Sequence, residues 1–304
     1  MQLTDAGLET VLLFEEGLEL PHFAAFPLVD SEEGRAALRR YYEPFLELAR
    51  DRRVPLVLSA PTWRANPDWG RLLGYGADDL AAVNRRAVGL LETFRDDALE
   101  PAEREGVVVE ACIGPRGDAY RPERLMDARE AEAYHAVQLG ALADTACAQA
   151  TALTLTHVEE AVGIVRAATR AGLPIHVGFT VETDGRLPAG DSIEDAIRAV
   201  DDATDGAAES FLINCAHPTH FADALPEGES WQRIRGLRAN ASRRSHAELD
   251  EAAELDSGDP RDLAARYVAL RRDLPSLELV GGCCGTDIRH VTAICDAWLA
   301  ADAG

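Results

Sequence analysis

The chain has 304 residues with 53 acidic and 30 basic side chains, all of the basic ones arginine, which gives a formal net charge of −23. A surface this negative repels phosphate backbones and anionic lipids, so the charge excludes nucleic acid as a partner. A hydrophobic content of 47% excludes a disordered chain, because disorder combines high net charge with low hydrophobicity.

Short β-branched or apolar runs alternate with longer segments of helical spacing, which indicates repeated βα units. The eight runs that we expect to form strands are residues 3–5, 54–60, 106–114, 148–153, 174–180, 210–215, 234–240 and 277–282. The segments that we expect to form helices are residues 31–52, 77–99, 128–142, 156–171, 193–203, 260–272 and 287–301. Only a weak helix separates the sixth and seventh runs. Ser31, Thr156 and Asp191 have the spacing to acidic residues that is typical of helix N-caps.

Eight strands that alternate with helices predict a single (β/α)8 TIM barrel domain over residues 1–304. A doubly wound open sheet is the alternative, but it usually carries a Gly-rich phosphate turn after the first strand, and residues 5–9 lack one. Residues 242–259, which follow the seventh run, indicate either a long loop on the catalytic face or a solvated insertion.

The chain has no stretch near the roughly 20 apolar residues of a membrane helix, and its opening lacks the pattern of a secretory signal. We therefore expect a cytoplasmic protein without a membrane partner, and a homo-oligomer stays open. Cysteines are too sparse for a disulfide scaffold. They lie at positions 112, 147, 215, 283, 284 and 295.

A glycine-flanked cysteine pair, Cys283 and Cys284, directly follows the last expected strand in the segment Gly-Gly-Cys-Cys-Gly-Thr. Adjacent side chains of a strand point to opposite faces, so both thiols can meet one metal only if the backbone leaves the extended form. Cys215 ends the sixth run, and the ends of barrel strands six and eight lie on the same face. Three thiolates there would bind Zn²⁺ and leave one tetrahedral position open.

Other readings of the cysteines stay open. A vicinal disulfide between Cys283 and Cys284 has poor geometry, and His217 with His220 could complete a four-ligand site with Cys215. The remaining three cysteines are expected in the core, although Cys112 lies near the end of the third strand.

These segments resemble the homocysteine S-methyltransferases, a family that includes betaine-dependent enzymes. The resemblance runs nearly end to end. It is carried by the Gly-Gly-Cys-Cys-Gly-Thr segment and by the Asn-Cys pair at 214–215, with support from residues 4–10, 113–115 and 179–187. It implies a zinc-dependent barrel with Cys215, Cys283 and Cys284 as metal ligands and no protein nucleophile. A small-molecule thiol acceptor, homocysteine or a relative, would bind the metal as a thiolate and receive a methyl group, forming methionine from homocysteine.

The resemblance weakens where the family holds the amino group of homocysteine. The glutamate that the family commonly carries at the end of strand four is replaced by Leu153. Asp5 matches the family's other acidic contact, and Glu182 after strand five could compensate for the lost carboxylate. Asn214 and Asn240 match segments at the active face and are further expected substrate contacts, with Asn214 orienting the site.

The methyl donor stays open among betaine, S-methylmethionine, S-adenosylmethionine and methyltetrahydrofolate. Trp63 or Trp69 could cover a cationic donor by cation–π attraction, and ordinary packing explains them equally well. Two other functions compete with the methyltransferase: a non-catalytic zinc-binding or thiol-sensing barrel, which Leu153 motivates, and a disulfide redox protein.

Overall fold

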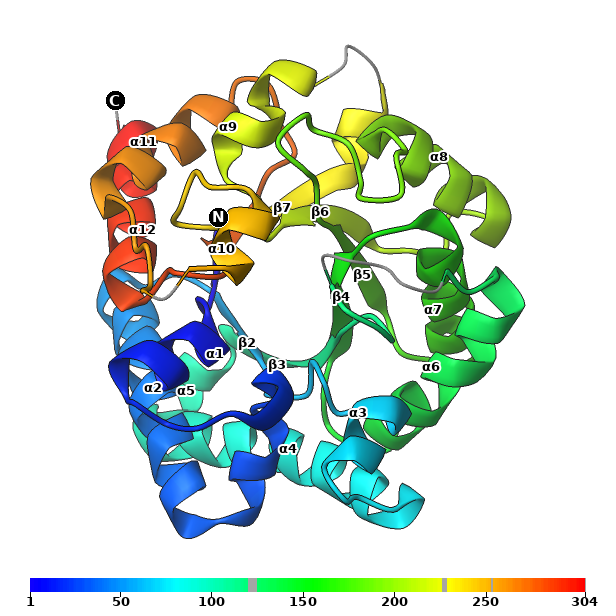
Figure 1. Ribbon diagram of the computed structural model, residues 1–304. Helices are drawn as coiled ribbons and strands as arrows, with labels where there is room; N and C mark the ends of the chain where they lie inside the picture. The colour runs from blue at the N-terminus through cyan, green and yellow to red at the C-terminus, as the bar shows by residue number, and fades with distance from the viewer. Residues whose placement is uncertain (120–124, 226–228, 253, 304) are drawn as a thin grey trace.

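The computed structural model describes residues 1–119, 125–225, 229–252 and 254–303. Its parallel strands close into a barrel in chain order, with β8 pairing back to β1 (Figure 1). The strands are β1 Gln2–Thr4, β2 Leu56–Ser59, β3 Val107–Ile113, β4 Gln149–Leu155, β5 Ile175–Phe179, β6 Ser210–Asn214, β7 Ile234–Ala239 and β8 Leu279–Gly282. The predicted TIM barrel is confirmed, and the open sheet is wrong.

Helices surround the barrel and cover its outer face (Figure 1). The long ones are α2 Glu32–Arg52, α4 Ala77–Ala98, α6 Ala128–Ala143, α7 Val158–Ala171, α8 Ile193–Thr204, α11 Pro260–Leu270 and α12 Ile288–Ala303. The short ones are α1 Leu8–Thr10, α3 Pro67–Leu72, α5 Pro101–Arg104, α9 Pro218–Phe221 and α10 His246–Asp250. Short 3-10 or π turns occupy Val11–Glu15, Pro21–Phe23, Phe26–Asp30, Ala222–Ala224 and Glu229–Arg233.

The predicted helix starts are confirmed to within two residues. Ser31 caps α2, and its hydroxyl accepts a hydrogen bond from the Gly34 backbone N–H at 3.0 Å. The caps of α7 and α8 are His157 and Ser192, each one residue after the one predicted. Between β6 and β7 the described residues form only α9 and short 3-10 turns, as the weak pattern there indicated.

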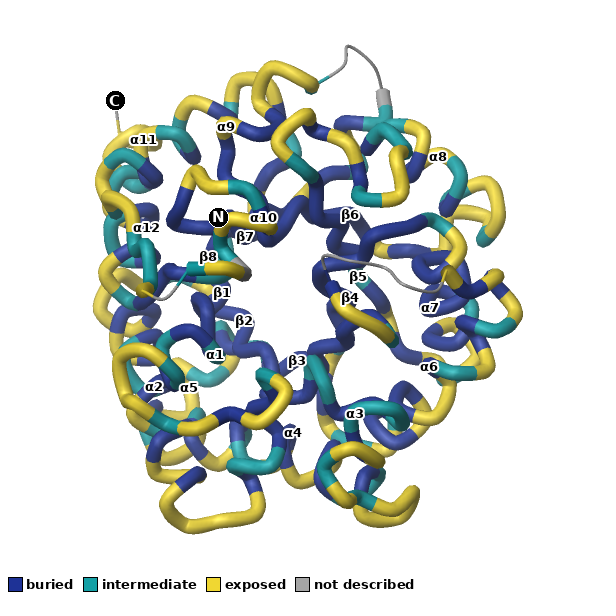
Figure 2. Tube along the Cα trace, viewed as in Figure 1, coloured by how far each residue is buried: buried dark blue, intermediate teal, exposed yellow. Residues whose placement is uncertain are grey.

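Burial follows the two-layer design of the barrel. The strands are buried almost throughout, and the helices bury the face that packs on them while the opposite face meets solvent (Figure 2). Helix α7 shows the pattern, with Ala161, Ile164, Val165 and Ala168 buried at helical spacing. In the part of the chain that the structure describes, no helix is both long and apolar enough to cross a membrane.

The barrel places the loops after each strand at one end, where the site lies. The described residues between 242 and 259 fold back over this end, and Ser242, Leu249, Leu255 and Asp256 among them line its cavity. The prediction of a loop on the catalytic face is therefore confirmed. The same segment contains α10, which the sequence pattern did not predict.

Candidate functional site

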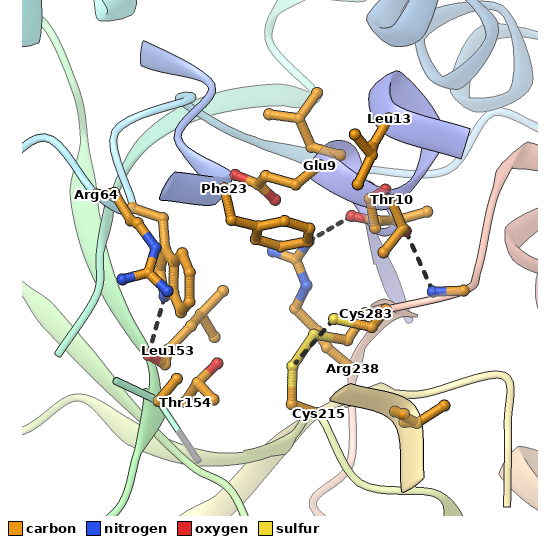
Figure 3. Close-up of a pocket in the computed structure, with 18 of the residues that line it drawn as sticks. Glu9, Thr10, Leu13, Phe23, Arg64, Leu153, Thr154, Cys215, Arg238 and Cys283 are labelled. Carbon is orange, nitrogen blue, oxygen red and sulfur yellow. Dashed lines mark hydrogen bonds between the residues drawn. A yellow bond between two sulfur atoms is a disulfide. The ribbon is translucent and has the colours of Figure 1, made fainter. Parts of the chain in front are cut away.

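A cavity of about 560 Å³ opens at the carboxyl end of the barrel. Its wall comes from the β1–α1 turn, the loops after β2 and β3, the end of β4, and the segments after β6, β7 and β8. Figure 3 shows that Cys215 and Cys283 face this space together with Glu9, Phe23 and Arg64. Both ends of the chain therefore contribute to one pocket.

The three predicted ligand cysteines meet at the floor of this cavity. The sulfur atoms of Cys215, Cys283 and Cys284 all lie within 4.8 Å of one another. Cys215 and Cys283 form a disulfide, with their Cα atoms 5.4 Å apart (Figure 3), and the Sγ atoms of Cys215 and Cys284 lie 3.8 Å apart. No other group of three or more potential ligand side chains gathers this closely among the described residues.

This cluster fits a zinc site in both chemistry and spacing. A tetrahedral site with Zn–S bonds of about 2.3 Å places its sulfur atoms about 3.8 Å apart. The separation of 3.8 Å between Cys215 and Cys284 matches that edge. Reduction of the disulfide would supply the thiolates of Cys215 and Cys283 beside that of Cys284, and three protein ligands leave one position for a further group.

Cys215 has an unusual backbone that other groups hold in place. Its φ of 52° lies in the left-handed region, which residues other than glycine seldom adopt. Its carbonyl oxygen accepts hydrogen bonds from Asn240 Nδ2 at 2.9 Å, His246 Nε2 at 2.6 Å and Thr180 Oγ1 at 3.4 Å. Strained backbone of this kind persists when its surroundings fix it, and three donors to one carbonyl supply that constraint.

Strand β8 ends immediately before the cysteine pair, as the argument from side-chain direction required. The three glycines that flank the cysteine pair are required for different physical reasons. A Cβ at Gly281 would collide with Thr4, and one at Gly282 would collide with Thr286, whereas Gly285 has a φ of 77°. Close packing therefore requires the first two glycines, and backbone freedom explains only the third.

Beside the cysteines, Asp5 is buried in an ion pair with Arg238 of β7. The Ser59 backbone N–H also donates to Asp5 at 3.2 Å, and Arg238 donates to the Ser59 hydroxyl at 2.8 Å. The Ser59 hydroxyl in turn donates to Glu110 at 2.8 Å. Burial raises the pKa of Asp5 from 3.8 to about 6, although Arg238 opposes that rise. The anionic neighbours, Asp5 foremost, keep the pKa of Arg238 above its usual value despite burial.

The other three expected substrate contacts lie outside the cavity wall. Asn214 is fully buried and bridges β6 to β4, because its amide accepts from the Thr154 N–H at 2.9 Å and donates to the Thr154 hydroxyl at 2.8 Å. Asn240 holds the Cys215 carbonyl. Glu182 lies 3.4 Å from Nδ1 of His246, on the side away from the bond to Cys215.

The four-ligand alternative with histidines finds no support in the geometry. His217 caps α9 and accepts from the Thr219 backbone N–H at 3.3 Å, and burial lowers its pKa from 6.5 to about 4. His220 donates to the Arg243 carbonyl at 2.9 Å. Neither histidine belongs to the sulfur cluster.

The sequence of residues 3–298 matches the family model of the homocysteine S-methyltransferases. The chain belongs to the homocysteine S-methyltransferase family. It is a methyltransferase enzyme, and this membership argues against the non-catalytic barrel.

Solved structures of a homocysteine methyltransferase share the fold of this family member. The metallated form of MmuM from Escherichia coli superposes with a TM-score of 0.76 at 17% identity, covering 97% of this chain and 96% of that one. The oxidized form gives 0.75 at 16% identity, with 97% and 94% covered, and the apo form gives 0.70 at 16%, with 98% and 95% covered. No curated protein matches the chain in sequence.

The remaining cysteines of this methyltransferase are buried, as predicted. Cys147 and Cys295 belong to the hydrophobic core. Cys112 lines the cavity without joining the sulfur cluster, and burial raises its pKa well above the usual value, so it stays a thiol.

The two tryptophans lie beside a cation of the protein itself. The guanidinium carbon of Arg64 lies 4.7 Å from the ring centroid of Trp63 and 4.0 Å from that of Trp69. Trp63 also donates its indole N–H to the Leu153 carbonyl at 3.2 Å. Arg64 thus makes with both rings the cation–π contact that the sequence suggests for a cationic donor.

Glu9 is a pocket residue that the sequence did not single out as a site. It lines the cavity in α1, it is half-buried, and no described residue forms an ion pair with it. Burial raises its pKa from 4.5 to about 7, against the lowering effects of its own backbone N–H and of Arg64. An acidic residue within the first helix of a barrel, four residues after Asp5, is a signal that could have marked it.

Proposed function

We propose that this enzyme is a zinc-dependent thiol S-methyltransferase that transfers a methyl group from a small donor to homocysteine or a related thiol. The observation that supports this function is the convergence of the Cys215, Cys283 and Cys284 sulfurs within 4.8 Å at the catalytic end of the barrel. Family membership and the metallated relative agree with it.

Different residues of the protein would hold the metal and position its ligands in such a reaction. Cys215, Cys283 and Cys284 would hold the metal, and Asn240, His246 and Thr180 would keep Cys215 aimed at it. A bound zinc ion lowers the pKa of a thiol in its open position, so that the acceptor is a thiolate at neutral pH. The cavity would hold acceptor and donor in line.

We further propose that the 304 residues work as one cytoplasmic catalytic domain. We also propose that the four expected substrate contacts take part in binding, one of them directly and three through other residues; they are Asp5, Glu182, Asn214 and Asn240. Asp5 lines the cavity, whereas Glu182, Asn214 and Asn240 would act through His246, Thr154 and Cys215, which they contact.

A methylation assay on zinc-loaded, reduced enzyme tests the function. Homocysteine is offered with betaine, S-methylmethionine, S-adenosylmethionine and methyltetrahydrofolate in turn, and methionine is measured. We expect methionine from at least one donor and its loss in Cys215→Ser. Absence of product with every donor, at one zinc per chain, would refute homocysteine methylation.

Disulfide exchange is the second candidate, which the bond between Cys215 and Cys283 favours. A redox protein would lose two thiols reversibly under mild oxidant whether or not metal is present. The methyltransferase instead requires that oxidation release zinc, because the disulfide takes two of its ligands. Thiol titration together with zinc release separates the two functions.

A further inference from the structure

Recognition of an amino-acid thiol requires a counter-charge for its ammonium group. A buried ammonium without a hydrogen-bonded anion is strongly disfavoured. The resemblance to the family points to carboxylates at positions 153 and 5 for this purpose, but neither position offers a free carboxylate in this chain. Leu153 is apolar and buried in the cavity wall, and Asp5 is already neutralised by Arg238.

The cavity contains another carboxyl group in a suitable place. Glu9 lies on the segment that packs directly on the cysteine loop, since the Gly7 N–H donates to the Thr286 carbonyl at 3.2 Å and the Gly285 N–H donates to Thr10 at 3.2 Å. Its carboxyl group faces the space that the cysteines, Arg64 and Leu153 also face (Figure 3).

The other acidic side chains of the wall are less suited. Asp118 and Glu254 are exposed at the rim. Asp256 accepts hydrogen bonds from the Ser242 hydroxyl at 2.6 Å and the Gly258 N–H at 3.1 Å. Among the wall residues that the structure describes, Glu9 is the half-buried carboxyl group that has no ion-pair partner.

We propose that Glu9 is the specificity-determining residue that binds the ammonium group of an amino-acid thiol acceptor, in the role of the family's glutamate that Leu153 replaces here, while Asp5 stays paired with Arg238. This inference rests on the proposed methyltransferase function. An ammonium group beside Glu9 would give the carboxylate the partner it lacks in the structure, and burial of both groups would strengthen their attraction.

Binding of two acceptors that differ only in the amine tests this assignment. Homocysteine and 4-mercaptobutanoate, which has the same thiol and carboxylate but no amine, are titrated calorimetrically into zinc-loaded wild type, Glu9→Gln and Glu19→Gln at pH 8. Glu19 is an exposed residue outside the cavity and serves as the matched control. The amide variant keeps the shape of the side chain and removes its charge.

We expect Glu9→Gln to lower homocysteine affinity about 10- to 100-fold and to leave 4-mercaptobutanoate affinity unchanged, as for the loss of one hydrogen bond between charged groups. Glu19→Gln should match wild type for both compounds. Equal losses for the two acceptors, or no loss for either, would each overturn the assignment.

Turnover measured on the same samples separates this inference from the function on which it rests. If wild type makes methionine but Glu9→Gln binds homocysteine as tightly relative to 4-mercaptobutanoate as wild type does, the assignment of Glu9 fails and the function stands. If wild type makes no methionine with any donor, the function fails. In that case equal wild-type affinities for the two acceptors would also overturn the assignment.

Discussion

Glu9→Gln should stabilise the substrate-free protein more at pH 8 than at pH 5. Burial raises the pKa of Glu9 from 4.5 to about 7. Between these values the folded protein retains a proton that the unfolded chain has released, so the free energy of unfolding of wild type falls as the pH rises. Above about pH 7 both states are ionised and the loss is complete. Glutamine removes this dependence because it does not titrate.

The structure sets the size of the effect. A displacement of the pKa from 4.5 to about 7 corresponds to about 3 kcal/mol of unfolding free energy. Because Glu9 is only half-buried, solvent screening reduces the expected gain to about 1–2 kcal/mol more at pH 8 than at pH 5.

Urea unfolding of the zinc-loaded enzyme at the two pH values measures this difference. Glu19→Gln provides the control, since an exposed substitution should change stability by less than about 0.5 kcal/mol at either pH. A Glu9→Gln gain that is the same at both pH values, or a loss at pH 8, would refute the reasoning, because the pocket would then stabilise the ionised carboxylate without a ligand.

Three further predictions concern the metal site and the ion pair of Asp5. Cys215→Ser should reduce zinc from one per chain to a small fraction, measured by metal analysis after dialysis, whereas Cys147→Ser in the core should keep it; equal zinc in both variants would contradict the metal site. His246→Ala should weaken zinc binding roughly 10- to 100-fold in a chelator competition, because the Cys215 carbonyl loses a donor. Unchanged affinity would mean that Asn240 and Thr180 suffice. Arg238→Met should destabilise the protein by about 3–5 kcal/mol at pH 8, where the buried Asp5 loses its partner and must either stay ionised or take up a proton from a solution that holds few. The loss should be smaller at pH 5, below the Asp5 pKa of about 6, because the carboxyl group is then protonated; a loss independent of pH would point to packing instead.

The barrel was predictable because its signals are local. The eight apolar runs and the intervening amphipathic segments give every strand and every long helix to within two residues. The cap positions at Thr156 and Asp191 were one residue early, because His157 and Ser192 are the residues that adopt extended backbone before the helix. Spacing alone does not distinguish two neighbouring polar residues.

The metal cluster was predictable because strand order fixes where Cys215 and the cysteine pair emerge. The contacts of Asp5 and Glu182 were not. Asp5 pairs with Arg238, which comes 233 residues later, and Glu182 pairs with His246 from a loop that folds back over the barrel. Such pairings depend on tertiary packing, although Arg238, the buried one of the two arginines in β7, stands in an expected strand and was a signal that some anion had to meet it.

The closure of β8 against β1 has a consequence for synthesis of the protein. Gly282 donates its N–H to the Asp5 carbonyl at 3.0 Å, so the first and last strands build one wall of the pocket together. A chain still emerging from the ribosome carries Cys215 without its two partner cysteines. We therefore expect that a nascent chain cannot capture the metal tightly, and that loading follows release of the complete barrel. Ribosome-bound chains arrested before residue 279 should then retain no zinc.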